Sequence, residues 1–207
     1  MTSHTPATAG AAVPAGSLRA DARRNRARVL EAAQAAFATE GLSVPLDEIA
    51  RRAGVGAGTV HRHFPSKEAL FEAVMVNRLQ QYIDSARELA ASGRPGAALF
   101  DFLSRMTEQA AMKKDLADAL AGAGIDVSGA TSAVTQELRD AIGTLLVQAQ
   151  QAGTVRPDVG NAQLMALVAG VFLATRRSSD PRFAEQVMTV VLDGLRTGAP
   201  AAGAGTP

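Results

Sequence analysis

The sequence predicts an all-α protein with a small amino-terminal domain and a larger carboxy-terminal helical bundle. Apolar residues recur at helical spacing through most of the 207 residues, and clusters containing Gly or Pro separate these stretches. No stretch shows the apolar and polar alternation that is typical of strands. Residues 19–67 hold 9 Lys and Arg against 5 Asp and Glu, a net +4, and the rest hold 12 against 15, a net −3. Only the basic part is therefore expected to meet nucleic acid.

Composition argues against several classes of protein. The chain has no cysteine, so disulfides and thiolate metal sites are excluded. Residues 1–18 lack the basic start and apolar segment of a signal peptide and are expected to be a disordered tail, and residues 197–207 a flexible one. The longest apolar run, residues 164–175, is too short to cross a bilayer. We expect a cytoplasmic protein without a membrane segment.

The amino-terminal domain, residues 19–66, is predicted to contain three helices. The first covers about residues 22–39, because Leu30, Ala33 and Phe37 share one face. Five arginines lie near its start: Arg19, Arg23, Arg24, Arg26 and Arg28. They have two interpretations, a solvated helix start or an arm that contacts phosphates, and the sequence favours neither.

A second helix begins near residue 46, and Gly54 is placed to end it. Its apolar residues form one stripe: Leu46, Ile49, Ala50 and Ala53. The third helix, about residues 57–63, is too short to be stable without tertiary packing. Val60 and Phe64, four residues apart, are expected to anchor it.

The opposite face of the third helix is polar, small at one end and cationic at its centre. It consists of Gly58, Thr59, His61, Arg62 and His63. This face suits a DNA major groove, where Arg62 could bind a guanine edge and the histidines the flanking phosphates. Phe64-Pro65 then ends the helix, and Ser66 is placed to cap the next one. Lys67 would lie at that helix start, a favourable place for a phosphate.

The segment DEIARRAGVGAGTVHRHFPSKEALF closely resembles the amino-terminal DNA-binding domain of the TetR family of bacterial transcriptional regulators. It departs from the family pattern at Gly56, where a Ser or Thr helix cap is usual, and at His61, where Tyr is usual. Loss of the hydroxyl cap costs only about a few tenths of a kcal/mol. Histidine at position 61 places a titratable group where a contact to the DNA backbone is expected. From these motifs and the resemblance, the predicted DNA-binding residues are Arg28, Gly58, Thr59, His61, Arg62, His63 and Lys67.

The carboxy-terminal domain, residues 67–196, is predicted to bind an effector and to dimerise. A long helix from Ser66 to about Ala91 joins it to the first domain. Further helices are expected at residues 97–112, 113–121, 131–152, 161–176 and 181–196, with a flexible link at 122–129.

The last two helices have two interpretations. The first of them is apolar all around its axis, and Ala166, Ala169 and Gly170 permit close helix approach. Both helices could simply be monomer core, but we favour a homodimer interface because so apolar a helix needs cover from both sides. The resemblance implies the same pairing, since family members dimerise through their last two helices.

A pocket for a small molecule is a further expectation. Family members commonly release DNA when an effector binds in the body, although apolar residues at helical spacing are more often plain core. The candidate lining residues are Tyr82, Phe100, Met106, Leu138, Ile142 and Phe172.

No enzyme, metal or cofactor site is indicated. The sequence contains no HExxH, GxSxG or P-loop motif. His61 and His63 would diverge by about 200° on a helix, so a shared metal ion is not expected. The leading hypothesis is a homodimeric repressor of transcription, released from a palindromic operator by a small-molecule effector. The alternative is a helical ligand-binding or protein-interaction module that has lost DNA binding.

Overall fold

The computed structural model describes residues 15–111, 128–175 and 182–198, together with Ser178 and Asp180. Within these residues the chain is helical, and an isolated bridge between Val155 and Arg196 is its only β pairing. The elements are α1 (Ala15–Glu40), a 3-10 turn (Gly41–Ser43), α2 (Leu46–Ala53), α3 (Ala57–His63), α4 (Lys67–Ala90), α5 (Pro95–Ala111), α7 (Ser128–Gln151), α8 (Asn161–Thr175) and α9 (Phe183–Leu195). The prediction of an all-α fold is confirmed. No helix among the described residues combines the length and the apolar character that a membrane span requires.

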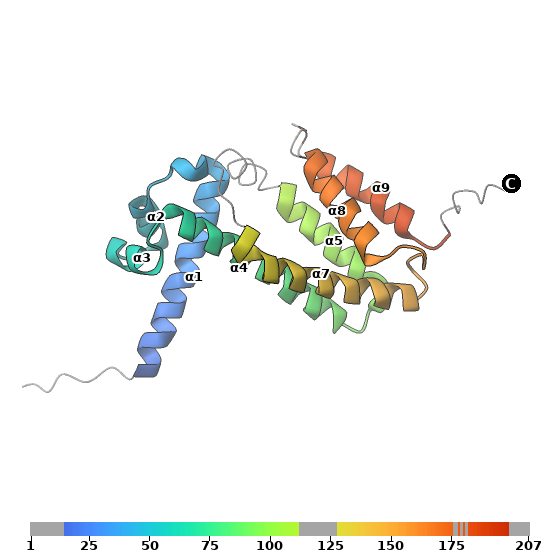
Figure 1. Cartoon of the computed structure of the whole chain (residues 1–207), viewed down its shortest axis with the longest axis horizontal. Coiled ribbons are helices and arrows are strands. Elements are labelled where there is room, and N and C mark those ends of the chain that lie inside the picture. Colours follow the sequence, from blue (N-terminus) through green and yellow to red (C-terminus); the bar gives the residue numbers. More distant parts are fainter. Residues whose placement is uncertain (1–14, 112–127, 176–177, 179, 181, 199–207) are drawn as a thin grey trace, which may run out of the picture.

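The helices form two regions, which we call the head (residues 15–75) and the body (the described residues from 79 onward) (Figure 1). In the head, α1 packs against α2 and α4, and α2 packs against α3. The Phe37 and Phe71 rings meet at its centre, with 5.7 Å between their centroids. The buried residues of the head are Val29, Leu30, Ala33, Ala36, Phe37, Val44, Ile49, Ala50, Ala53, Val60, Phe64, Leu70, Phe71 and Val74.

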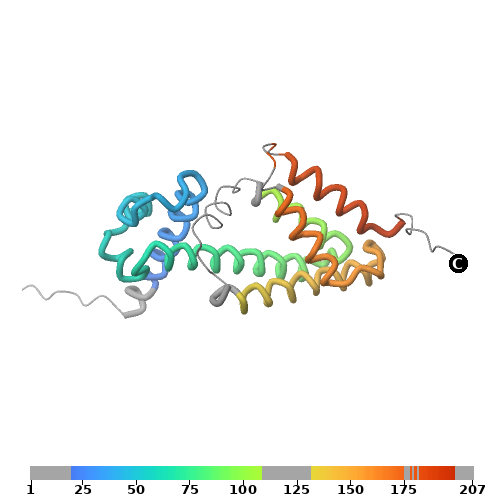
Figure 2. Tube along the Cα trace, turned by 45° about the horizontal axis from the view of Figure 1, so that its top comes forward, coloured from blue at the N-terminus to red at the C-terminus, as the bar shows by residue number. Residues whose placement is uncertain are grey.

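Helix α4 belongs to both regions. Its first part buries Leu70, Phe71 and Val74 in the head, and its second part buries Ile83 and other residues in the body. Figure 2 shows this helix running from the head into the body, where it packs on α7 and α5. One continuous helix therefore supplies side chains to both cores. The predicted division of the chain after residue 66, at the start of α4, stays a prediction.

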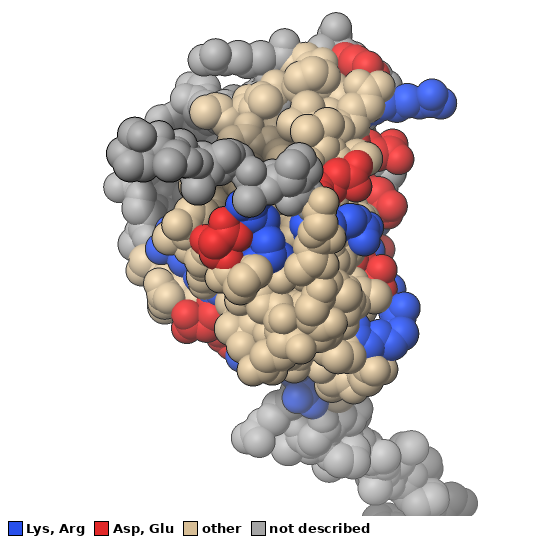
Figure 3. Space-filling view, turned by 90° about the vertical axis from the view of Figure 1, so that its right-hand side faces the viewer, with Lys and Arg blue, Asp and Glu red and all other residues tan. Residues whose placement is uncertain are grey.

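The body is a bundle of α4, α5, α7, α8 and α9 around an apolar core. Among the described residues, Thr107 is the one fully buried polar side chain, and its hydroxyl donates to the Leu103 carbonyl. At the end far from the head, most of the visible surface is neither acidic nor basic (Figure 3). The predicted helix faces are confirmed, since Phe100, Leu103, Leu138 and Ile142 are all buried.

Two predicted boundaries are wrong. Helix α1 begins at Ala15, so residues 15–18 belong to a helix and not to a disordered tail. Helix α7 begins at Ser128, so the last two residues of the expected link, 128–129, are helical. The predicted element at residues 113–121 lies outside the described residues.

Candidate nucleic-acid interface

The turn between α2 and α3 sets the angle between these two helices. Gly54 ends α2 with φ of 63°, in the left-handed region that favours glycine, and its N–H bonds back to the last turn of the helix. Gly56 takes the position before α3 in extended geometry and makes no side-chain cap. Helix α3 therefore forms without the hydroxyl cap, as the sequence indicated.

Helix α3 is held from one side only. Val60 is completely buried, and Phe64, 3% exposed, ends the helix while its N–H donates to the Val60 carbonyl at 2.8 Å. A helix of seven residues is not stable alone, so these two side chains fix it to the head. The predicted anchor is confirmed.

The other side of α3 presents the predicted face to solvent. Gly58, His61, Arg62 and His63 are exposed, and Thr59 is half-buried. A Cβ atom at Gly58 would meet no atom within 4 Å, so the backbone is open to an approaching molecule. The Arg62 guanidinium has no hydrogen-bond or ion-pair partner in the described part of the chain, which leaves its five donors available.

His61 makes a contact that the sequence did not reveal. Its Nε2 lies 3.1 Å from Oδ1 of Asp47, at the start of α2. Both side chains are exposed, so this pair links the two helices of the helix-turn-helix at its surface. A phosphate contact by His61 stays a prediction, and it would have to replace or share the Asp47 contact. In the described residues no group of three or more His, Cys, Asp or Glu could hold a metal ion.

Lys67 has an internal partner as well. Its Nζ donates to the Leu42 carbonyl at 2.7 Å and so ties the start of α4 to the 3-10 turn. The predicted cap is confirmed, because the Ser66 hydroxyl accepts the Ala69 N–H at 3.2 Å. A phosphate contact by Lys67 also stays a prediction, since only one of its three donors is used in this way.

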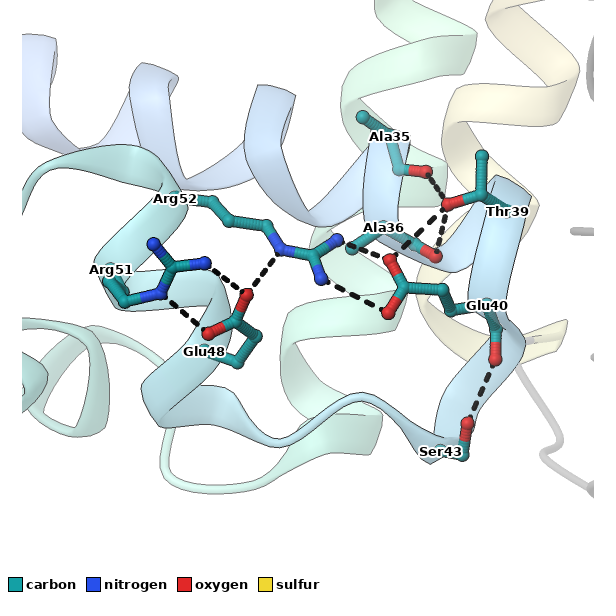
Figure 4. Close-up of polar contacts among 8 residues, drawn as sticks. All are labelled: Ala35, Ala36, Thr39, Glu40, Ser43, Glu48, Arg51 and Arg52. Carbon is teal, nitrogen blue, oxygen red and sulfur yellow. Dashed lines mark hydrogen bonds and ion pairs between the residues drawn. The ribbon is translucent and has the colours of Figure 1, made fainter.

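A charged network joins α1 to α2 (Figure 4). Arg52 pairs with Glu40 at the end of α1 and donates from Nε to Glu48 at 2.8 Å. Arg51 donates to both carboxylate oxygens of Glu48 at 2.7 Å. Hydrogen bonds from Arg51 and then Arg52 lower the pKa of Glu48 to about 2, and Arg52 lowers the pKa of Glu40. The two arginines are thus engaged within the head.

Two further arginines lie on α1 beside the helix-turn-helix. The Arg26 guanidinium stands over the Phe64 ring, with Cζ 5.7 Å from the centroid. Arg28 donates to Asn25 at 2.6 Å, and its Nη1 would lie 3.8 Å from a Cβ placed on Gly54. The predicted residue Arg28 therefore lies over the α2–α3 turn. Arg26, which was not among the predicted DNA-binding residues, lies at the end of α3.

The six candidate effector residues all belong to the body core or pack against it. The Tyr82 hydroxyl accepts from Arg78 Nη2 at 3.0 Å, and the Arg196 guanidinium lies 4.4 Å from the centroid of the Phe100 ring. Met106, Leu138 and Ile142 are buried, and Phe172 is half-buried. The structure thus brings these residues into one apolar region, and their role in binding a ligand stays a prediction.

Comparison with known proteins matches both regions to one family. Residues 29–74 match the family described as bacterial regulatory proteins, tetR family, and residues 94–197 match the transcriptional regulator SbtR-like C-terminal domain. A TetR transcription regulatory protein from Mycobacterium vanbaalenii is 50% identical, with a TM-score of 0.72, over 86% of this chain and 99% of that one.

Two other relatives are more distant or shorter in their match. Thermus thermophilus FadR, a TetR family transcriptional repressor in complex with lauroyl-CoA, is 26% identical, with a TM-score of 0.53, over 86% of this chain and 99% of that one. The HTH-type transcriptional regulator SrpR of Pseudomonas putida is 42% identical over 60 residues. That match spans 28% of this chain and 28% of the length of SrpR.

Proposed function

The chain belongs to the TetR family of bacterial transcriptional regulators, and we propose that it is a repressor that binds a palindromic operator as a homodimer. The observation that carries this proposal is the cationic face of α3, with exposed Arg62 at its centre and completely buried Val60 behind it. A helix that is packed against the head on one side and polar on the other can enter a major groove while its buried side stays in the core.

Each residue of this face has a distinct part in the proposal. Open space around Gly58 allows the α3 backbone to approach the DNA, and the Thr59 hydroxyl can bond to a base or a phosphate. Arg62 can donate two parallel hydrogen bonds to O6 and N7 of a guanine. His61 and His63, on either side of it, face the phosphates of the two groove walls.

Selection of bound duplexes from a random pool tests the proposal directly. We expect a palindromic motif whose half-sites lie about 34 Å or a multiple of this apart. Arg62→Ala should weaken binding to that motif by about 1–3 kcal/mol and relax the preference at one base pair of each half-site. Equal losses on all sequences would contradict base readout. No enrichment at low salt would favour a module without DNA binding.

Dimerisation through α8 and α9 is part of the proposal. These helices pack on each other, yet Leu167, Leu173 and Val190 remain 42%, 57% and 72% exposed. Ala166, Ala169 and Gly170 are exposed on α8, where small side chains permit close helix approach. A second copy would cover this apolar surface. Val190→Asp should therefore shift the protein toward monomers in sedimentation equilibrium, and an unchanged mass would contradict this interface.

We propose that a small apolar ligand releases the repressor from DNA by binding in the body. Two observations support this proposal. The second part of α4 and the six candidate residues belong to the same apolar core or pack against it. The structure of FadR, a relative, is a complex with lauroyl-CoA. A ligand that prefers one position of α4 changes the placement of both heads. By linkage, the ligand lowers the affinity for DNA by the same factor by which DNA lowers the affinity for the ligand. Titration of operator complexes with lauroyl-CoA, whose acyl chain is apolar and whose CoA part is charged, and with small apolar molecules tests this coupling. Release by none of them would leave α4 without a switching role.

A further inference from the structure

The amino-terminal part of α1 extends beyond the core of the head. From Ala20 onward, Val29 is the first buried residue of the helix, and residues 21–28 are exposed apart from half-buried Asn25. These eight residues span about 12 Å. In Figure 1 this part of α1 runs past α3, on the side away from α2. The segment therefore receives little support from tertiary packing, and a helix with so little support is marginal in water.

The segment is strongly basic. Its sequence, DARRNRAR, contains four arginines and one acidic residue, Asp21, which pairs with Arg24. Its apolar side chains are only those of Ala22 and Ala27. It therefore has no apolar face with which to enter a lipid surface or an apolar groove. Its chemistry fits a polyanion.

The position of the segment continues the cationic face of α3. Arg26 stands over the ring of Phe64, the residue that ends α3. Arg23 lies one turn before Arg26 on the same side of α1 and has no partner among the described side chains. By contrast, Arg51 and Arg52 are committed to Glu48 and Glu40. The available positive charge of the head therefore runs from α3 onto the start of α1.

We propose that residues 21–28 of α1 are a second DNA-binding surface, which contacts the phosphates that flank the groove occupied by α3. This inference rests on the proposed function of α3. The arginines of the segment contact the backbone and carry no base preference, so they lengthen the site without changing its sequence. On DNA, Arg24 exchanges its Asp21 contact for a phosphate.

The test compares two full-length variants with the wild type. Arg23→Gln with Arg24→Gln removes two charges from the segment, and Gln keeps the helix propensity. The matched control, Arg105→Gln with Arg139→Gln, removes two exposed charges from α5 and α7. Affinity for the duplex selected from the random pool is measured between 50 and 200 mM salt. Because the homodimer loses four arginines in all, we expect the slope of log affinity against log salt to fall by about 3.6 in the first variant and to stay unchanged in the control.

Duplex length provides a second readout. The segment spans about four base pairs at 3.4 Å each, so flanks of that length on each side of the motif should raise wild-type affinity. The same flanks should give the Arg23→Gln, Arg24→Gln variant no such gain. The selected sequence should be the same for all three proteins.

The outcomes separate this inference from the function of α3. If the wild type binds the selected duplex and the segment variant keeps both its salt slope and its gain from flanks, the inference is overturned while the proposed function stands. If the wild type binds no duplex at low salt, both are overturned. Binding of the wild type to anionic vesicles in preference to flanked duplex would also overturn the inference.

Discussion

The head and the body are both helical, but the surfaces that they expose differ in chemical character. In the head, α3 buries Val60 and exposes a cationic face, whereas in the body α8 and α9 leave Leu173 and Val190 exposed. The head adds a charged network, Glu40, Arg52, Glu48 and Arg51, to its small core. The chemistry that a region leaves uncovered reports its partner: a polar face suits a wet, charged groove, and an apolar face suits another apolar surface.

The two regions are joined by α4, the one helix that contributes side chains to both described cores. Because α4 buries residues in both cores, it is the element through which the proposed ligand in the body would act on the head. The comparison therefore leads to four predictions, which begin with the separate cores and end with a single helix cap.

Removal of a buried ring from each core should have the largest effect. Phe71, from α4, and Phe102, from α5, are both fully buried, the first in the head and the second in the body. Each change to Ala should lower the free energy of unfolding by about 3–5 kcal/mol, because it leaves a cavity. Hydrogen exchange resolved by region should show faster exchange in α1 to α3 for Phe71→Ala and in α5 and α9 for Phe102→Ala. Identical patterns would show that the two regions unfold as one unit.

Local patterns in the sequence predicted the helices and the buried side of α3, but they did not predict the partners of polar side chains. Helical spacing placed Val60 and Phe64 correctly because both lie on one short element. The contact between Arg52 and Glu40 joins residues 12 apart, and that between Lys67 and Leu42 joins residues 25 apart, across different elements. Spacing within a helix gives the direction of a side chain, and only tertiary packing decides what it meets.

The charged network should make the head more sensitive to acid than the body. The pKa of Glu48 is lowered from 4.5 to about 2, so the folded state favours its carboxylate. Its stabilisation is complete above pH 4.5 and is lost as the pH falls toward about 2. Arg51→Gln with Arg52→Gln should therefore flatten the fall in melting temperature over this range.

The body offers a matched control for this prediction. Arg156 lowers the pKa of Asp158, but this pair joins residues two apart and links no second helix. Arg156→Gln should change the acid dependence of the melting temperature less than the head variant does. An equal change in the two variants would show that the link between α1 and α2 adds nothing specific to the head.

DNA affinity should depend on pH through His61 and His63, whereas dimerisation should not. Histidine changes its charge between pH 5 and 8, and a phosphate favours the charged form. Operator affinity should therefore fall a few-fold as the pH rises through neutrality. His61→Gln should reduce this dependence on pH. Asp47→Asn tests whether the Asp47 carboxylate, 3.1 Å from His61 Nε2, competes with phosphate for the histidine, because this variant would then bind the operator more tightly. A flat profile in the wild type would remove both histidines from the interface.

The smallest effect should come from restoring a hydroxyl cap to α3. Gly56 has φ of −67° and ψ of 140°, which suit any residue, and a Cβ there would lie 3.9 Å from Thr59 Oγ1, so serine fits without strain. Gly56→Ser should stabilise the head by about a few tenths of a kcal/mol, because the hydroxyl can accept an N–H from the first turn of α3. The gain should be visible in hydrogen exchange of α3 and absent from the body. A loss of operator affinity without loss of stability would mean that the backbone at Gly56 lies against the DNA, which would extend the contact surface to the start of α3.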